Sequence, residues 1–192
     1  MDHFKLTDGI LHAEDVPLPT IAQEVGTPVY VYSRATLERH ARVFREGLGE
    51  LDNPLILFAV KANPNLAVLR VLQREGFGAD VVSGGELRRA LAAGMTPDKI
   101  VFSGVGKTRA ELELGLDTGI AQFNIESREE GRELAELAAA RGEKARCALR
   151  INPDVDAGTH EKISTGKADN KFGVPLHHAA EAFAELGALP GL

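Results

Sequence analysis

The sequence of 192 residues predicts an α/β fold built from repeated strand-then-helix units. Five short β-rich runs end in polar or Gly-containing turns, and each is followed by a stretch with helical periodicity. The runs are spaced roughly twenty residues apart and cover Leu55–Val60, Ala79–Val82, Ile100–Ser103, Gln122–Ile125 and Ala145–Ile151. Repeating units of this length form either a doubly wound open sheet or a (β/α)₈ TIM-type barrel.

The first helix is expected directly after Ser33, which follows a mixed opening segment. From Leu37 onward, Ala41, Phe44 and Leu48 continue one apolar stripe at helical spacing. We expect this stripe to pack against the sheet.

Start and stop signals mark the later helices. Thr108 with Glu111, and Ser127 with Glu130, match the S/T-x-x-E capping box that opens a helix. A last helix is expected over Pro175–Leu186. Glycine ends a helix at low cost because it adopts the left-handed conformation, and this role is expected for Gly76, Gly94 and Gly142.

Polar residues at the strand ends favour the barrel over the doubly wound sheet. Several of them share a face with small or apolar residues, as inward-facing barrel positions do near the catalytic mouth. In the first strand Leu55, Leu57, Ala59 and Lys61 lie on one face. Lys61 is therefore expected at the C-terminal end of its strand, where both architectures build active sites.

The composition is that of an ordinary globular protein, with 44% hydrophobic and 26% charged residues. Both signs of charge are spread along the chain around a net charge of -6, which argues against a nucleic-acid partner. No apolar run is long enough to span a bilayer and the N-terminus lacks a signal-peptide layout, so we expect a cytoplasmic protein without membrane contact. The lone Cys147 fits a small buried residue better than a nucleophile, and no metal-ligand spacing appears.

Three charged residues within or at the ends of strands are candidates for chemistry. Lys61 follows an apolar strand, where desolvation can free its amine to form a Schiff base, although a solvated turn lysine explains the same position. Asp80 and Arg150 lie within strand runs. These two either form internal ion pairs or orient a cofactor and set the charge around it.

Two further segments have functional alternatives. Ser103–Thr108 follows a strand and opens a capped helix, as a phosphate-binding P-loop does, but Val101 stands where that motif needs its first glycine. The polar stretch from Asn152 to Phe172 is either a loop of moderate order or a lid over the active end of the fold, and its reactive side chains are His160, Ser164, Thr165 and Lys171.

Several segments together make the chain resemble the diaminopimelate decarboxylase family of fold-type III pyridoxal-phosphate enzymes. The match is nearly collinear from Thr27 to Gly173. The part from Leu149 onward is more similar to that family than to ornithine decarboxylases. The whole match rests on Phe58–Asn63, Gly78–Leu87, Ile100–Thr108, Phe123–Ser127, Leu149–Val155, Thr159–His160, Ile163–Gly166 and Lys171–Gly173.

The resemblance implies a fold, a cofactor and a role for each candidate residue. Residues 29–192 would form an incomplete (β/α)₈ barrel of about five to six βα units, and residues 1–28 would belong to a second, mostly β domain. Lys61 would be the lysine that binds pyridoxal 5'-phosphate as a Schiff base, with Asp80 and Arg150 beside the cofactor.

The family's reaction is the decarboxylation of meso-diaminopimelate to lysine, carried out by a homodimer. The sequence stops before the family's ring-stacking histidine and Gly-rich phosphate loop, so we expect a truncated N-terminal portion that is inactive alone. Three alternatives stay open: a decarboxylase or racemase acting on another amino acid, a non-catalytic barrel fragment that binds a decarboxylase subunit, and a nucleotide-binding P-loop protein. Retention of Lys61 argues against a dead paralogue, and Val101 argues against the P-loop.

Overall fold

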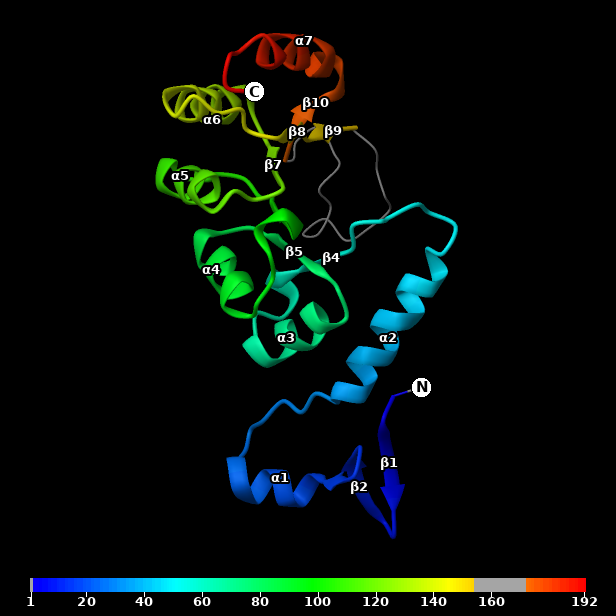
Figure 1. Ribbon diagram of the computed structural model, residues 1–192. Coiled ribbons are helices and arrows are strands. Elements are labelled where there is room, and N and C mark those ends of the chain that lie inside the picture. Colours follow the sequence, from blue (N-terminus) through cyan, green and yellow to red (C-terminus); the bar gives the residue numbers. More distant parts are fainter. Residues whose placement is uncertain (1, 154–171) are drawn as a thin grey trace.

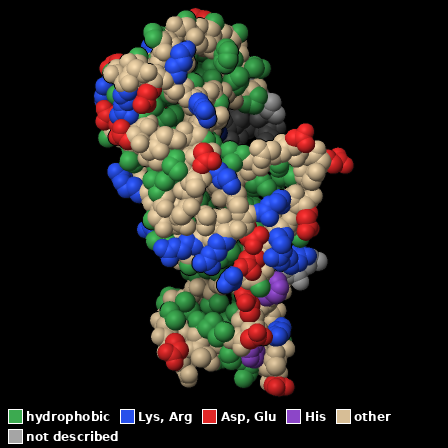
Figure 2. Space-filling model, viewed as in Figure 1, with side chains coloured by type: hydrophobic (Ala, Val, Ile, Leu, Met, Phe, Trp, Pro, Cys, Tyr) green, Lys and Arg blue, Asp and Glu red, His purple; other side chains and the backbone are tan. Residues whose placement is uncertain are grey.

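The structure is a computed structural model that describes residues 2–153 and 172–192. A small N-terminal unit lies at one end, the helix α2 leads away from it, and a parallel sheet with its helices forms the other end (Figure 1). A narrow waist separates the two parts (Figure 2). The candidate loop residues His160, Ser164, Thr165 and Lys171 lie outside the described residues.

The N-terminal unit is an antiparallel sheet of β1 (Phe4–Thr7), β2 (Ile10–Ala13) and β3 (Val16–Pro17), followed by α1 (Leu18–Val25). Asp8 and Gly9 join β1 to β2 with φ angles of 50° and 78°. A tight two-residue hairpin requires such positive angles. The assignment of residues 1–28 to a second, mostly β domain stays a prediction.

Hydrophobic side chains gather on the surface of this N-terminal unit (Figure 2). Leu6 and Val25 are 72% and 69% exposed, whereas Ala13 is buried. A three-stranded sheet that buries so little apolar surface is only marginally stable by itself. Its attachment to the rest of the chain therefore matters.

Glu14 makes that attachment at the start of α2 (Arg34–Gly47). Its carboxylate accepts hydrogen bonds from the Ser33 hydroxyl at 2.8 Å and from the Ala35 N–H at 2.9 Å. The bond from Ala35, followed by that from Ser33, lowers the pKa of Glu14. Ser33 in turn caps the helix by accepting from the Thr36 N–H.

The apolar stripe of α2 packs against a helix as well as against the sheet. Leu37 and Ala41 belong to a cluster with Val68 and Leu72 of α3 (Leu66–Arg74) and with Phe58 of the main sheet, while Phe44 is 56% exposed. Helical periodicity identified the buried face but not the share of it that α3 covers.

Five parallel strands form the main sheet in sequence order: β4 (Leu57–Ala59), β5 (Gly78–Val81), β6 (Ile100–Phe102), β7 (Gln122–Ile125) and β8 (Cys147–Leu149). The helices that connect them follow one another along one side of the sheet (Figure 1). A doubly wound sheet reverses its strand order and carries helices on both faces. The arrangement is therefore that of an arc of a (β/α) barrel.

The connecting helices after α3 are α4 (Gly84–Ala92), α5 (Arg109–Thr118) and α6 (Arg128–Ala140), and a short 3₁₀ turn, η2 (Pro97–Lys99), precedes β6. The last predicted strand is broken at Arg150. Beyond it, β9 (Ile151–Asn152) pairs in parallel with β10 (Val174–Pro175), which leads into α7 (Leu176–Gly187). Within the described ranges, no helix combines the length and apolarity that a bilayer crossing requires.

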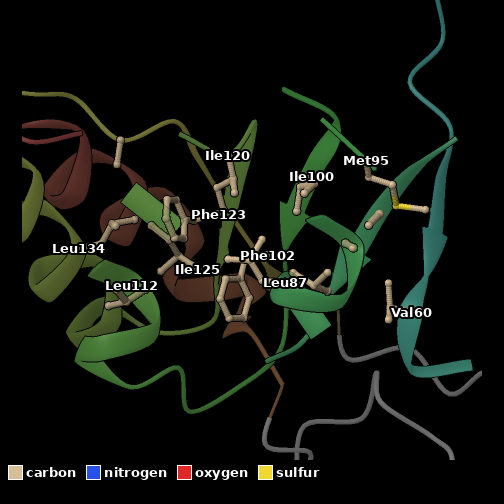
Figure 3. Packing of buried hydrophobic residues seen from close by; sticks show 14 of the residues in the cluster. Val60, Leu87, Met95, Ile100, Phe102, Leu112, Ile120, Phe123, Ile125 and Leu134 are labelled. Carbon is tan, nitrogen blue, oxygen red and sulfur yellow. The ribbon is translucent and has the colours of Figure 1, made fainter. Parts of the chain in front are cut away.

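The hydrophobic core lies between the sheet and its helices. Ile100, Phe102 and Ile125 from the strands meet Leu87 and Leu112 from the helices, and each is at most 1% exposed (Figure 3). Burial of each large side chain contributes about 1.5–3 kcal/mol. The core therefore fixes the spacing of the strands, and their other face points away from the helices.

Most local signals for the helix ends are confirmed. Gly76, Gly94 and Gly142 all adopt positive φ angles. Thr108 and Glu111 form the complete capping box of α5. At α6 the Ser127 hydroxyl accepts from the Glu130 N–H, while the Glu130 carboxylate binds Lys107.

Glu111 also fastens α4 to α5. One carboxylate oxygen accepts from the Gly84 N–H at 2.8 Å, and the other accepts from the Thr108 N–H at 3.0 Å. These bonds, led by that from Gly84, lower the pKa of Glu111. One side chain thus satisfies the free N–H groups at the starts of two helices.

We predict that Glu111→Gln lowers the free energy of unfolding at neutral pH by about 1–2 kcal/mol. Because the folded-state pKa lies below the unfolded-state value, this contribution is present above the unfolded pKa, about 4.3, and disappears as pH falls through the folded pKa. Urea denaturation at several pH values between about pH 3 and pH 7 measures this contribution. The control Glu113→Gln removes a half-exposed pair with Arg109; an equal loss there would contradict the assignment.

Candidate functional site

A cavity of about 690 Å³ lies at the C-terminal ends of the five parallel strands. All three candidate residues, Lys61, Asp80 and Arg150, line it. The C-terminal ends of parallel strands meet at one rim, which explains how residues far apart in sequence come together. The other lining residues are Val82, Ser103, Gly104, Val105, Asn124, Glu126, Ala148, Leu149 and Phe172.

Lys61 reaches this cavity from a turn and not from the strand on which it was expected. Val60–Ala62 form the 3₁₀ turn η1, in which the Asn63 N–H donates to the Val60 carbonyl at 3.1 Å. Val60 is fully buried and anchors the turn, whereas Lys61 is exposed. The described residues therefore leave the amine open to a ligand, and they do not desolvate it.

Asp80 lies in β5 between Ala79 and Val81, which are fully buried on the opposite face. Its carboxylate accepts a hydrogen bond from the Ser103 hydroxyl at 2.5 Å. The Ser103 oxygen in turn accepts from the Asn124 side-chain amide at 2.9 Å. Asp80 thus has a neutral hydrogen-bond partner on the cavity side of the sheet.

Arg150 has the ion-pair partner that its position in a strand suggested. Its guanidinium donates to Glu126 at 2.9 Å and lies 4.9 Å from the centre of the Phe172 ring. The Glu126 side chain is only 3% exposed, and its second oxygen accepts from the Gly173 N–H at 3.1 Å. Glu126 therefore orients Arg150 and joins it to the chain just before β10.

Lys107 is turned away from any ligand that a P-loop lysine would bind. Its ammonium donates to the carbonyls of Gly104 and Asn124 at 2.8 and 2.7 Å, and to Glu130 at 2.7 Å. An ammonium has three donors, so all are satisfied within the protein. The Lys107 side chain is 1% exposed, and burial raises the pKa of Glu130, an effect that the neighbouring ammonium opposes.

Sequence reasoning missed two polar residues that line this cavity, Asn124 and Glu126, and Gln122, which hydrogen-bonds to Asn124. They alternate with Phe123 and Ile125, which are buried on the helix side. This period of two is the signal that could have identified them, because alternate strand residues face opposite sides. Asp80 was identified because it is a charged residue within a strand, and the polar residues of β7 could have been identified in the same way.

Neither a metal centre nor a reactive thiol emerges from the part of the chain that the structure describes. No group of three or more His, Cys, Asp and Glu side chains there is placed to hold an ion. Burial raises the pKa of Cys147, which disfavours the thiolate that a nucleophile requires. The chemistry of the site therefore rests on the cavity residues.

A barrel rim that presents an amine, a carboxylate and a guanidinium defines a small-molecule site of the kind that (β/α) proteins use for catalysis. The family described as "Pyridoxal-dependent decarboxylase, pyridoxal binding domain" matches residues 34–192. The chain belongs to this family.

Individual relatives agree with this family. The chain is 53% identical over 191 residues to a diaminopimelate decarboxylase of Zymomonas mobilis and 53% identical over 193 residues to that of Vibrio cholerae. It covers 45% and 46% of their lengths, so it spans about half of the curated relatives it matches.

Solved structures show the same fold. Diaminopimelate decarboxylase from M. jannaschii in complex with L-lysine superposes with a TM-score of 0.86 at 36% identity, over 98% of this chain and 45% of that one. The Helicobacter pylori enzyme, also complexed with L-lysine, gives a TM-score of 0.85 at 41% identity, over 91% of this chain and 44% of that one.

We predict that Lys107→Met lowers the free energy of unfolding by about 3 kcal/mol, because it leaves the buried Glu130 carboxyl without its cation. Urea denaturation measures this loss, with the exposed Lys144→Met as the matched control.

ATP binding, followed by calorimetry, should be undetectable in the unmodified protein. Measurable ATP affinity that Lys107→Met abolishes would restore the P-loop interpretation.

Proposed function

We propose that this chain forms the N-terminal part of the cofactor-binding barrel of a pyridoxal-phosphate-dependent diaminopimelate decarboxylase, which converts meso-diaminopimelate to lysine. The observation that carries the proposal is the convergence of Lys61, Asp80 and Arg150 on one cavity. The relatives that are 53% identical to this chain are diaminopimelate decarboxylases, which supports the proposed substrate.

The residues that line the cavity fit pyridoxal phosphate. Lys61 offers an exposed amine for the aldehyde. Arg150 offers a guanidinium that Glu126 holds in place, and a guanidinium suits an anionic group of the cofactor or of an amino-acid substrate. A volume of about 690 Å³ lies within the range of small-molecule sites.

In this proposal the chain's own residues bind and orient the cofactor and the substrate. When bound, pyridoxal phosphate supplies an electron sink for the carbon that loses carbon dioxide. Lys61 would hold the cofactor through its amine. Asp80 places a negative charge on the same rim, and the neighbouring β6–α5 loop is fixed because Lys107 binds the carbonyls of Gly104 and Asn124.

Alternative substrates are another basic amino acid for a decarboxylase, or an amino acid for a racemase. Lysine decarboxylase from Selenomonas ruminantium superposes with a TM-score of 0.77 at 22% identity, which shows the shared fold alone. A non-catalytic barrel fragment is the remaining alternative, and the exposed Lys61 disfavours it.

The proposal includes three properties of the whole protein: a closed (β/α)₈ barrel completed by a second, mostly β domain, a homodimer, and a cytoplasmic location. The sequential order of β4 to β8 supports the barrel. Size-exclusion chromatography with light scattering tests the dimer.

We predict that pyridoxal phosphate forms a borohydride-reducible adduct specifically on Lys61. The exposed amine lies on the rim of a cavity, whereas Lys107 is buried in its ion pair. Absorbance before and after reduction, followed by peptide mapping, identifies the modified lysine. Lys61→Ala should abolish the adduct, and the surface control Lys144→Ala should retain it.

Activity is tested on the full-length protein from the same reading frame. Formation of lysine from meso-diaminopimelate should fall by at least about 10³-fold in Lys61→Ala, as expected for loss of a covalent catalytic residue. Equal turnover of ornithine, arginine or lysine would favour another decarboxylase. An adduct spread over several lysines would contradict a built cofactor site.

A further inference from the structure

We infer that Ser103, oriented by Asn124 and Gln122, is a positioning residue that fixes the direction of the Asp80 carboxylate on the cavity side of the sheet. This inference rests on the proposed function and adds to it a hydrogen-bond relay of four residues. We define the relay as Gln122, Asn124, Ser103 and Asp80.

The chemistry of the donors fixes the direction of the relay. The Ser103 hydroxyl donates its single hydrogen to the Asp80 carboxylate across their 2.5 Å contact. The Ser103 oxygen then has only lone pairs left for Asn124, which must present its amide nitrogen at 2.9 Å. That orientation turns the Asn124 oxygen to the Gln122 amide, which donates at 2.8 Å.

Every donor in the relay thus points towards Asp80. Successive hydrogen bonds that run in one direction polarise one another.

The backbone holds these side chains in place across three neighbouring strands. Asp80 pairs with Val101 in the ladder, and Val101 pairs with Gln122. On the opposite face, Phe102 and Phe123 stack with ring centres 6.4 Å apart and are at most 2% exposed.

Lys107 adds a second restraint on the same segment. It donates to the carbonyl of Asn124 at 2.7 Å and to the carbonyl of Gly104, next to Ser103, at 2.8 Å. One buried ammonium thus ties the β6–α5 loop to β7. Asn124 and Ser103 therefore keep their separation without contact from a ligand.

The neutral donors leave the charge of Asp80 available to the cavity. The charge of Glu126 is paired with Arg150, whereas the bonds found for Asp80 come from an uncharged hydroxyl. The expected task of Asp80 is therefore to present its carboxylate to a ligand bound in the cavity, where a positive charge on that ligand would be favoured.

The test uses the full-length protein loaded with pyridoxal phosphate, whose absorbance is followed against pH. Ser103→Ala should move the titration midpoint by about 0.5–1 unit, since the Asp80 carboxylate loses the hydrogen bond that fixes its direction. Ser103→Thr keeps the hydroxyl and should restore the midpoint. Asn124→Leu should give a smaller shift in the same direction. The control Thr118→Val removes a hydroxyl on α5, outside the cavity lining, and should leave the midpoint unchanged.

A second measurement needs no cofactor. Ser103→Ala should change the NMR resonances of the Asn124 side-chain amide in the unloaded protein, because their acceptor is lost. An unshifted midpoint, or unchanged Asn124 resonances, in Ser103→Ala would overturn the relay. If the unmodified protein forms no Lys61 adduct, the proposed function fails and the task of the relay with it, while the Asn124 resonances still report whether the hydrogen bonds exist.

Discussion

The alternation of side chains along the parallel strands is the constraint on which the rest of the structure depends. In β5, Ala79 and Val81 face the helices and are fully buried, and Asp80 between them faces the cavity. The same alternation in β7 buries Phe123 and Ile125. The core and the candidate site are thus two faces of one sheet, and a one-residue slip in register would exchange them.

Two ion pairs, one behind the rim and one on it, connect segments that the sheet alone does not hold. Lys107–Glu130 joins the β6–α5 loop to the start of α6, and Glu126–Arg150 joins β7 to the chain beyond β8. Buried ion pairs contribute little net stability, because desolvation of the charges offsets their attraction. Their effect here is geometric, since the fully satisfied ammonium of Lys107 and the doubly bonded carboxylate of Glu126 each allow one arrangement.

Sequence reasoning predicted the parts of this fold that depend on neighbouring residues. The capping box at Thr108 and the helix-ending glycines are local signals, and the structure confirms them. It missed the turn at Lys61, because the alternating pattern continues through the residue at which the backbone leaves the strand. It could not pair Glu126 with Arg150 or Asn124 with Ser103, since these partners meet only when strands over twenty residues apart in sequence lie side by side.

Two carboxylates on one rim have different roles because their donors differ. Glu126 is almost fully buried and receives a guanidinium and a backbone N–H, so its charge is matched within the protein. Asp80 receives the hydroxyl of a relay whose other members are neutral amides. Neutral donors fix the direction of a carboxylate without cancelling its charge. The fold thus separates a carboxylate that holds another residue from one that a neutral hydroxyl turns towards the cavity.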